Sequence, residues 1–168
     1  MGKRLKKLQP PDSLHLNAAE GWLGLGDTAA AMAELDNIAP AIRTHPDVLE
    51  VRWQIFAKAN RWNACIDIAS VMTKLVPKKA EAWIHLAYSI RQARGGVEDS
   101  IPVLTSVVDK FPKDPLICYY LACYTAQTSR LTESTSWWDK AMTIAGKYGF
   151  LKKNPADGAG RSGLGTVA

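Results

Sequence analysis

The sequence of 168 residues lacks the features that mark membrane, secreted and disulfide-stabilised proteins. No apolar run approaches the roughly 18 residues that a membrane-spanning helix needs, so we expect no membrane association. The basic start of the chain continues into Gln9, Pro10, Pro11 and Asp12, where a secretory signal would carry an apolar stretch. The cysteines number only three, an odd count that excludes a disulfide scaffold and favours a reducing, cytoplasmic location.

An excess of charge of one sign is also missing from most of the chain. The formal net charge is +5, but residues 1–12 and residues 146–168 each carry +3, which leaves −1 for residues 13–145. The body of the chain is therefore nearly neutral, and we predict that it binds no nucleic acid. We expect residues 1–12 to form a flexible basic arm and residues 154–168 a flexible tail.

Residue groupings that carry catalysis or hold a metal or cofactor are missing as well. The three histidines are scattered along the chain one at a time. Cys118 and Cys123 are five residues apart, on different faces of a helix, whereas structural zinc sites use CxxC-like pairs. The glycines between residues 158 and 165 have no helix after them, which a phosphate-binding loop requires. We therefore expect no enzyme activity, no metal ion and no cofactor.

The sequence does contain an internal repeat of about 34 residues. Short polar turns begin at Gly26, Asn60, Gly95 and Ser129, which are 34, 35 and 34 residues apart. Between these turns, apolar residues recur every three or four positions, which predicts amphipathic helices and an all-α fold. The predicted helices span residues 13–24, 28–43, 47–59, 62–75, 80–92, 97–110, 115–127 and 131–145.

This helix–turn–helix unit resembles the tetratricopeptide repeat (TPR). The third unit carries the family's pattern most completely, in Trp83, Leu86, Ala87, Ile90, Gly95, Ser100, Leu104, Val107 and Pro112. The resemblance implies a right-handed superhelical array of antiparallel helical hairpins, a TPR-like α-solenoid. Arg52 and Trp53 depart from the pattern, because they stand where a leucine and a small residue are usual. The units implied by the repeat, within a domain of residues 13–145, are about 13–46, 47–79, 80–114 and 115–146.

Recurring small and large residues predict how the helices pack. Small residues let helix axes approach closely, and we expect Trp22, Leu104 and Trp138 to fill the space left between them. Trp138→Ala is accordingly predicted to cost a few kcal/mol through the cavity it would leave. Asp47 and Asp114 stand where helix N-caps are expected.

The resemblance also implies a binding surface, because TPR arrays present the first helix of each hairpin on a concave face. Tyrosines suit a recognition surface, and cations can donate to a carboxylate. In the opposing interpretation, the tyrosines pack between repeats and the cations are simply solvated. Leu16 and Glu20 stand where the TPR clamps for chaperone C-termini have Lys and Asn, so we do not expect that clamp. The candidate partner-binding residues are Gln54, Lys58, His85, Tyr88, Arg91, Gln92, Tyr119 and Tyr120.

The sequence favours a non-catalytic module that binds a peptide or protein segment on this concave face. The alternatives are a secretion- or assembly-type chaperone, or a self-associating scaffold subunit. The last helix has no repeat after it, so the apolar side that carries Trp138 and Met142 needs cover. Either residues 147–153 fold back as a short capping helix, or the chain self-associates through this C-terminal end.

Overall fold

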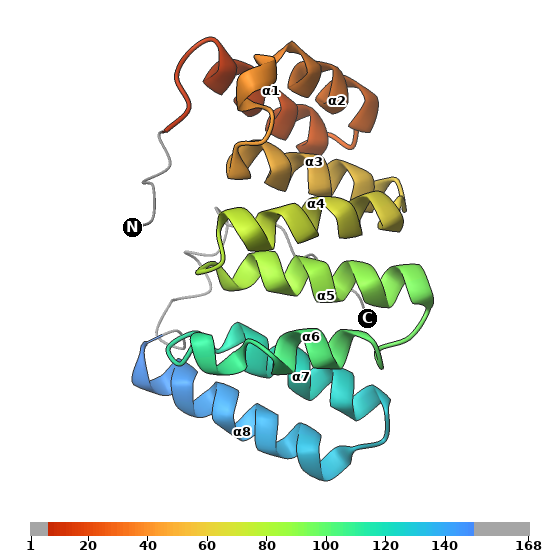
Figure 1. Cartoon of the computed structure of the whole chain (residues 1–168), viewed down its shortest axis with the longest axis vertical. Helices are drawn as coiled ribbons and strands as arrows, with labels where there is room; N and C mark the ends of the chain where they lie inside the picture. Colours follow the sequence, from red (N-terminus) through yellow and green to blue (C-terminus); the bar gives the residue numbers. More distant parts are fainter. Residues whose placement is uncertain (1–6, 150–168) are drawn as a thin grey trace.

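Eight α-helices, paired as four hairpins, make up the computed structural model, which describes residues 7–149 (Figure 1). No strand occurs among these residues, so the all-α prediction is confirmed. None of their helices is both long enough and apolar enough to cross a membrane. The helices are α1 (Asp12–Gly24), α2 (Thr28–Asn37), α3 (Pro46–Lys58), α4 (Trp62–Leu75), α5 (Ala80–Arg94), α6 (Ser100–Thr105), α7 (Leu116–Gln127) and α8 (Leu131–Lys147).

The hairpins stack one on the next along the long axis of the molecule, from α1 at one end to α8 at the other (Figure 1). We call the packing of a hairpin's second helix on the next hairpin's first helix a joint. The three joints are α2–α3, α4–α5 and α6–α7. This is the arrangement of a TPR-like α-solenoid. Of the predicted terminal segments, residues 1–6 of the arm, residues 150–153 of the expected cap and the tail 154–168 lie outside the described residues.

The turn inside each hairpin places a residue in the left-handed backbone region at the same repeat position. Gly26 and Gly95 have φ of 86° and 70°, and Asn60 and Ser129 have φ of 54° and 60°. Glycine reaches this region without steric cost, and asparagine tolerates it better than most residues. The period found in the sequence therefore corresponds to a period in backbone geometry.

Two helices are shorter than predicted. The helix expected over 28–43 ends at Asn37, because Ile38 and Ala39 are extended before Pro40, where proline disfavours helical geometry. The helix expected over 97–110 spans only Ser100–Thr105. At its end, the hydroxyls of Thr105 and Ser106 donate to the carbonyls of Ile101 and Val103, at 2.9 and 2.8 Å. Such local bonds compete with helix formation. Single-turn 3₁₀ helices follow at Pro40–Ile42 and Val108–Lys110.

One of the two predicted helix caps is confirmed. The Asp114 carboxylate accepts a hydrogen bond from the Leu116 backbone N–H at 2.9 Å, at the start of α7. Asp47 lies instead in the first turn of α3, and its own backbone N–H donates to Nδ1 of His45 at 3.2 Å. The imidazole nitrogen thus takes the capping position that the sequence assigned to the carboxylate.

The large residues expected to fill the interior are buried in the middle of the array and exposed at its two ends. Leu104 is fully buried, as are Leu35 and Ala69 at the matching repeat positions. Trp138 occupies the same position in the fourth unit, yet 46% of it is exposed, and among residues 7–149 no helix follows α8 to cover it. Trp22 is 41% exposed at the other end. The assignment of these two tryptophans to the core was wrong.

Candidate interaction surface

The eight candidate residues all lie on α3, α5 and α7, which with α1 form the first helices of the hairpins. We call the side of the array that these residues follow the first-helix face. Tyr119 and Lys58 are exposed, whereas His85 is only 6% exposed. The other five, Gln54, Tyr88, Arg91, Gln92 and Tyr120, are half-buried.

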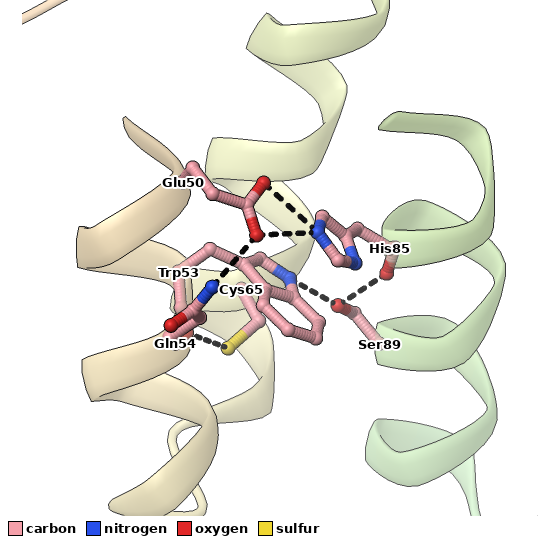
Figure 2. A network of polar contacts seen from close by, with 6 residues as sticks. All are labelled: Glu50, Trp53, Gln54, Cys65, His85 and Ser89. Carbon is pink, nitrogen blue, oxygen red and sulfur yellow. Dashed lines mark hydrogen bonds and ion pairs between the residues drawn. The ribbon is translucent and has the colours of Figure 1, made fainter. Parts of the chain in front are cut away.

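The assignment of His85 to an exposed groove was wrong, because its ring is covered by Trp53. The two rings are stacked with their centroids 3.9 Å apart and their planes 16° from parallel. His85 Nε2 lies 2.9 and 3.0 Å from the two carboxylate oxygens of Glu50 on α3 (Figure 2). His85 therefore ties α5 to α3 and is not available to a partner.

Trp53 lies at the centre of a polar network that joins the second unit to the third. Its indole N–H donates to the Ser89 hydroxyl at 3.0 Å, and that hydroxyl donates to the His85 carbonyl at 2.7 Å (Figure 2). The Gln54 side-chain amide donates to Glu50 at 2.9 Å, so this candidate residue also serves the network. A buried indole N–H needs such a partner, and the tryptophan that departs from the TPR pattern finds one.

The ionisation of Glu50 reflects these contacts. Burial acts to raise its pKa, but hydrogen bonding and charge from His85, followed by Gln54 and Lys79, outweigh burial. The net result is a Glu50 pKa below the ordinary value of a glutamate. The carboxylate is thus held in its charged form between the two units.

Lys58 is exposed but already has a partner inside the chain. Its ammonium group donates to the Leu23 carbonyl at 2.7 Å, near the C-terminus of α1. A cation is stabilised there by the negative end of the helix dipole. The basic candidate residues that could donate to a carboxylate ligand are Lys58, His85 and Arg91. Two of them, Lys58 and His85, therefore bind groups of the protein itself.

Tyrosines of α7 form the most accessible aromatic part of the first-helix face. Tyr119, 42% exposed, contacts Tyr120 edge-on with centroids 5.6 Å apart, and Tyr120 contacts buried Tyr124 edge-on at 6.0 Å. The guanidinium of Arg91 lies 5.7 Å from the centre of the Tyr124 ring. Burial and the neighbouring Tyr119 raise the pKa of Tyr120 to about 12, so its hydroxyl stays protonated at neutral pH. These contacts join Tyr119 and Tyr120 to buried Tyr124 in one aromatic group, with Arg91 beside Tyr124.

Tyr88 belongs to a different aromatic group. Its ring meets Trp62 edge-on at 5.7 Å and Trp53 edge-on at 6.3 Å. Tyr88 therefore packs between the second and third units, as the opposing interpretation of the tyrosines held, while Tyr119 does not. Sequence position alone does not separate these two tyrosines, because the difference depends on the large ring of Trp53.

Carboxylates on the first helices lie close enough to influence one another. Burial and the charge of Asp47 raise the pKa of Glu20. Burial raises the pKa of Asp114 and Glu81 raises it further, although the hydrogen bond from Leu116 opposes both. The first-helix face thus carries negative charge between α1 and α3 and again between α5 and α7.

The described residues hold no group of three or more histidines, cysteines or carboxylates that could bind a metal ion. Burial raises the pKa of the Cys65 thiol to about 11 and also raises that of Cys118. Neither of these thiols is a reactive thiolate near neutral pH.

Comparison with known proteins supports the fold and no more. No family model matches the chain, and no curated protein matches it. Among solved structures, a crystal structure of MamA has 14% sequence identity and a TM-score of 0.68, over 83% of this chain and 81% of that one. MamA 41-end from Desulfovibrio magneticus RS-1 has 14% identity and a TM-score of 0.67, over 81% of this chain and 76% of that one. At this identity the likeness shows a shared helical-repeat fold of the TPR type.

Proposed function

We propose that this chain is a non-catalytic module that binds a peptide or protein segment on its first-helix face, with Tyr119 at the centre of the contact. The observation that carries the proposal is the exposed Tyr119 ring, held in place by Tyr120, which itself rests on Tyr124. A large aromatic side chain that is already positioned loses little freedom on binding. Tyrosine is also among the residues that dominate binding energy at interfaces.

The charges of the surface favour a partner segment that is neutral or basic rather than acidic. Lys58 and His85 already bind groups of the protein. Asp47 and Glu81 are exposed on the same face, and the charge of Asp47 contributes to the raised pKa of Glu20. Like charges brought together at an interface are unfavourable, so acidic segments would be rejected.

A peptide library that varies both aromatic content and net charge tests this proposal. Tyr119→Ala should weaken the best-bound peptides by about tenfold or more, the equivalent of about 1.4 kcal/mol. Tyr148→Ala is the matched control, because Tyr148 is equally exposed but lies at the end of α8. Equal binding by the wild type and both variants, or selection of acidic peptides, would reject the proposed surface.

A further inference from the structure

The outer side of α8 exposes apolar residues at repeat positions that are buried in the joints between the preceding hairpins. At one repeat position Leu35, Ala69 and Leu104 are fully buried, and their counterpart Trp138 is 46% exposed. Seven residues before that position, Val97 is buried on the third unit, and its counterpart Leu131 is 68% exposed. We call the side of α8 that carries Leu131, Thr135, Trp138 and Met142 the tail face.

The outer side of α1 is the other half of such a joint. At one repeat position Val48, Ala82 and Ile117 are buried against the preceding unit, and their counterpart Leu14 is 61% exposed. We call the side of α1 that carries Leu14, Ala18, Gly21 and Leu25 the head face. The array thus ends in two unlike apolar faces.

The head face lacks the polar outer surface with which terminal repeats usually close a helical array, whereas α8 carries exposed Asp139 and Lys140 beside its apolar residues. Leu25 is exposed at the end of α1, and Met142 is exposed on α8. From Ser13 to Gly26, a stretch that includes most of α1, Glu20 is the single acidic residue and there is no lysine or arginine. Exposed helices normally carry charge on the side that faces water.

The sizes of the side chains on the two faces are complementary. In the α6–α7 joint, Leu104 shares one apolar cluster with Leu121 and Tyr124. At the tail face the counterpart of Leu104 is the larger Trp138. At the head face the counterparts of Leu121 and Tyr124 are the smaller Ala18 and Gly21, and a Cβ placed on Gly21 would meet no atom within 4 Å. A larger side chain on one face therefore matches a space on the other.

We infer that the tail face of one copy of this chain packs on the head face of a second copy and continues the array. The occupant is a second copy because the internal joints pair these same two kinds of face, second helix on first helix. A contact between unlike faces does not close after two subunits, so it produces rings or open filaments. The tail face adjoins the proposed peptide contact, because the centroids of the Trp138 and Tyr119 rings lie 6.1 Å apart. The test of association therefore changes Leu14 and Leu131 and leaves both rings intact.

Paired variants test this association and its direction. Leu14→Asp blocks the head face, Leu131→Asp blocks the tail face, and both sites are exposed enough for the chain to fold. The full chain is measured by light scattering over a range of concentrations. The wild type should grow beyond dimers, and each variant alone should stay near the 18.4 kDa of one chain. An equal mixture of the two variants should stop at twice that mass, because only one joint can form.

Val71→Asp changes an exposed apolar residue of α4, away from both ends, and should associate like the wild type. A Leu14→Asp variant that still dimerises would show tail-to-tail contact, and a Leu131→Asp variant that does so would show head-to-head contact. Either result overturns the inference, as does a wild type that stays monomeric at every concentration.

Discussion

The α4–α5 joint and the α6–α7 joint occupy equivalent places in the repeat, but the α4–α5 joint has a polar network beside its apolar contacts. Beside that joint, the first helices α3 and α5 are tied by the stacked rings of Trp53 and His85 and by the Glu50 carboxylate. We call the α4–α5 joint with these contacts the polar joint, and the α6–α7 joint the apolar joint. The α6–α7 joint is a continuous apolar cluster that includes Leu104 and Leu121. The repeat period therefore determines where helices meet, while individual side chains determine what holds them together and under which conditions.

Leu104→Ala should weaken the apolar joint and cause the largest loss of stability among these variants. The side chain is fully buried, so its removal leaves a cavity, and the free energy of unfolding should fall by about 3–4 kcal/mol. Urea denaturation followed by circular dichroism measures the loss. Leu25→Ala is the control, because Leu25 is exposed and its loss should cost less than about 0.5 kcal/mol. Equal losses for the two variants would contradict the apolar description of this joint.

Trp53→Phe should weaken the polar joint by a smaller amount, about 1–2 kcal/mol. The variant keeps a ring on His85 but removes the N–H that donates to Ser89 at 3.0 Å. The same denaturation experiment applies, and a broader transition would show that the two halves of the array unfold separately. The half-exposed Trp22→Phe should leave the midpoint unchanged. A Trp53→Phe variant as stable as the wild type would show that the hydrogen bond is dispensable.

Comparison of Glu50→Gln with the wild type should show that the stability contributed by the polar joint depends on pH. The pKa of Glu50 is lowered in the folded protein, so its contribution is complete above the unfolded pKa of about 4.5 and is lost as pH falls through the folded pKa. The wild type should be more stable than the variant by about 1 kcal/mol at pH 7, with the difference vanishing in stronger acid.

Glu34→Gln provides the matched control for that pH series. It removes another histidine–carboxylate contact, His15–Glu34 at 2.9 Å, which lies outside the polar joint. Measured over the same pH series, Glu34→Gln separates the loss of the Glu50 carboxylate from the loss of a histidine–carboxylate contact elsewhere in the chain. A Glu50→Gln difference that stayed constant from neutral pH into acid would contradict a lowered Glu50 pKa.

Trp138→Ala should have the smallest effect on a single chain, under about 1 kcal/mol, despite the size of the side chain. The ring is 46% exposed, so its removal opens little enclosed space. Thermal melting at a concentration where the chain is monomeric makes the measurement. A loss as large as that of Leu104→Ala would mean that something covers α8 even in the single chain.

The sequence predicts the fold well because its polar turns recur every 34 or 35 residues and its apolar residues recur every three or four positions between them. The boundaries of α4 match the prediction, at Trp62–Leu75, whereas α2 ends early at the residues before Pro40. A single proline has a definite effect on backbone geometry, so this end could have been predicted from Pro40. The early end of α6 depends on which carbonyls Thr105 and Ser106 reach, which a sequence pattern does not contain.

The candidate surface is less predictable, because helical spacing tells which side a residue is on and not what covers it. His85 stands on the predicted side of α5 but is buried by Trp53, a residue 32 positions earlier in the chain. The departure of Trp53 from the TPR pattern was visible in the sequence and was the signal that could have located the polar network. Exposure of Trp138 is different in origin, since it follows from its place in the last unit.

Each of the two joints contains a native cysteine that can report when that joint opens. Cys65 is buried on α4 in an apolar cluster against which Leu86 and Tyr88 of α5 pack, and Cys118 is buried in the α6–α7 cluster. Burial raises the pKa of both thiols, so neither reacts with an alkylating reagent while its joint is closed. Once half-buried Cys123 is replaced by serine, the two alkylation rates measure how often each joint opens in the native protein. The alkylation rates of Cys65 and Cys118 therefore report local opening on the two sides of the third repeat.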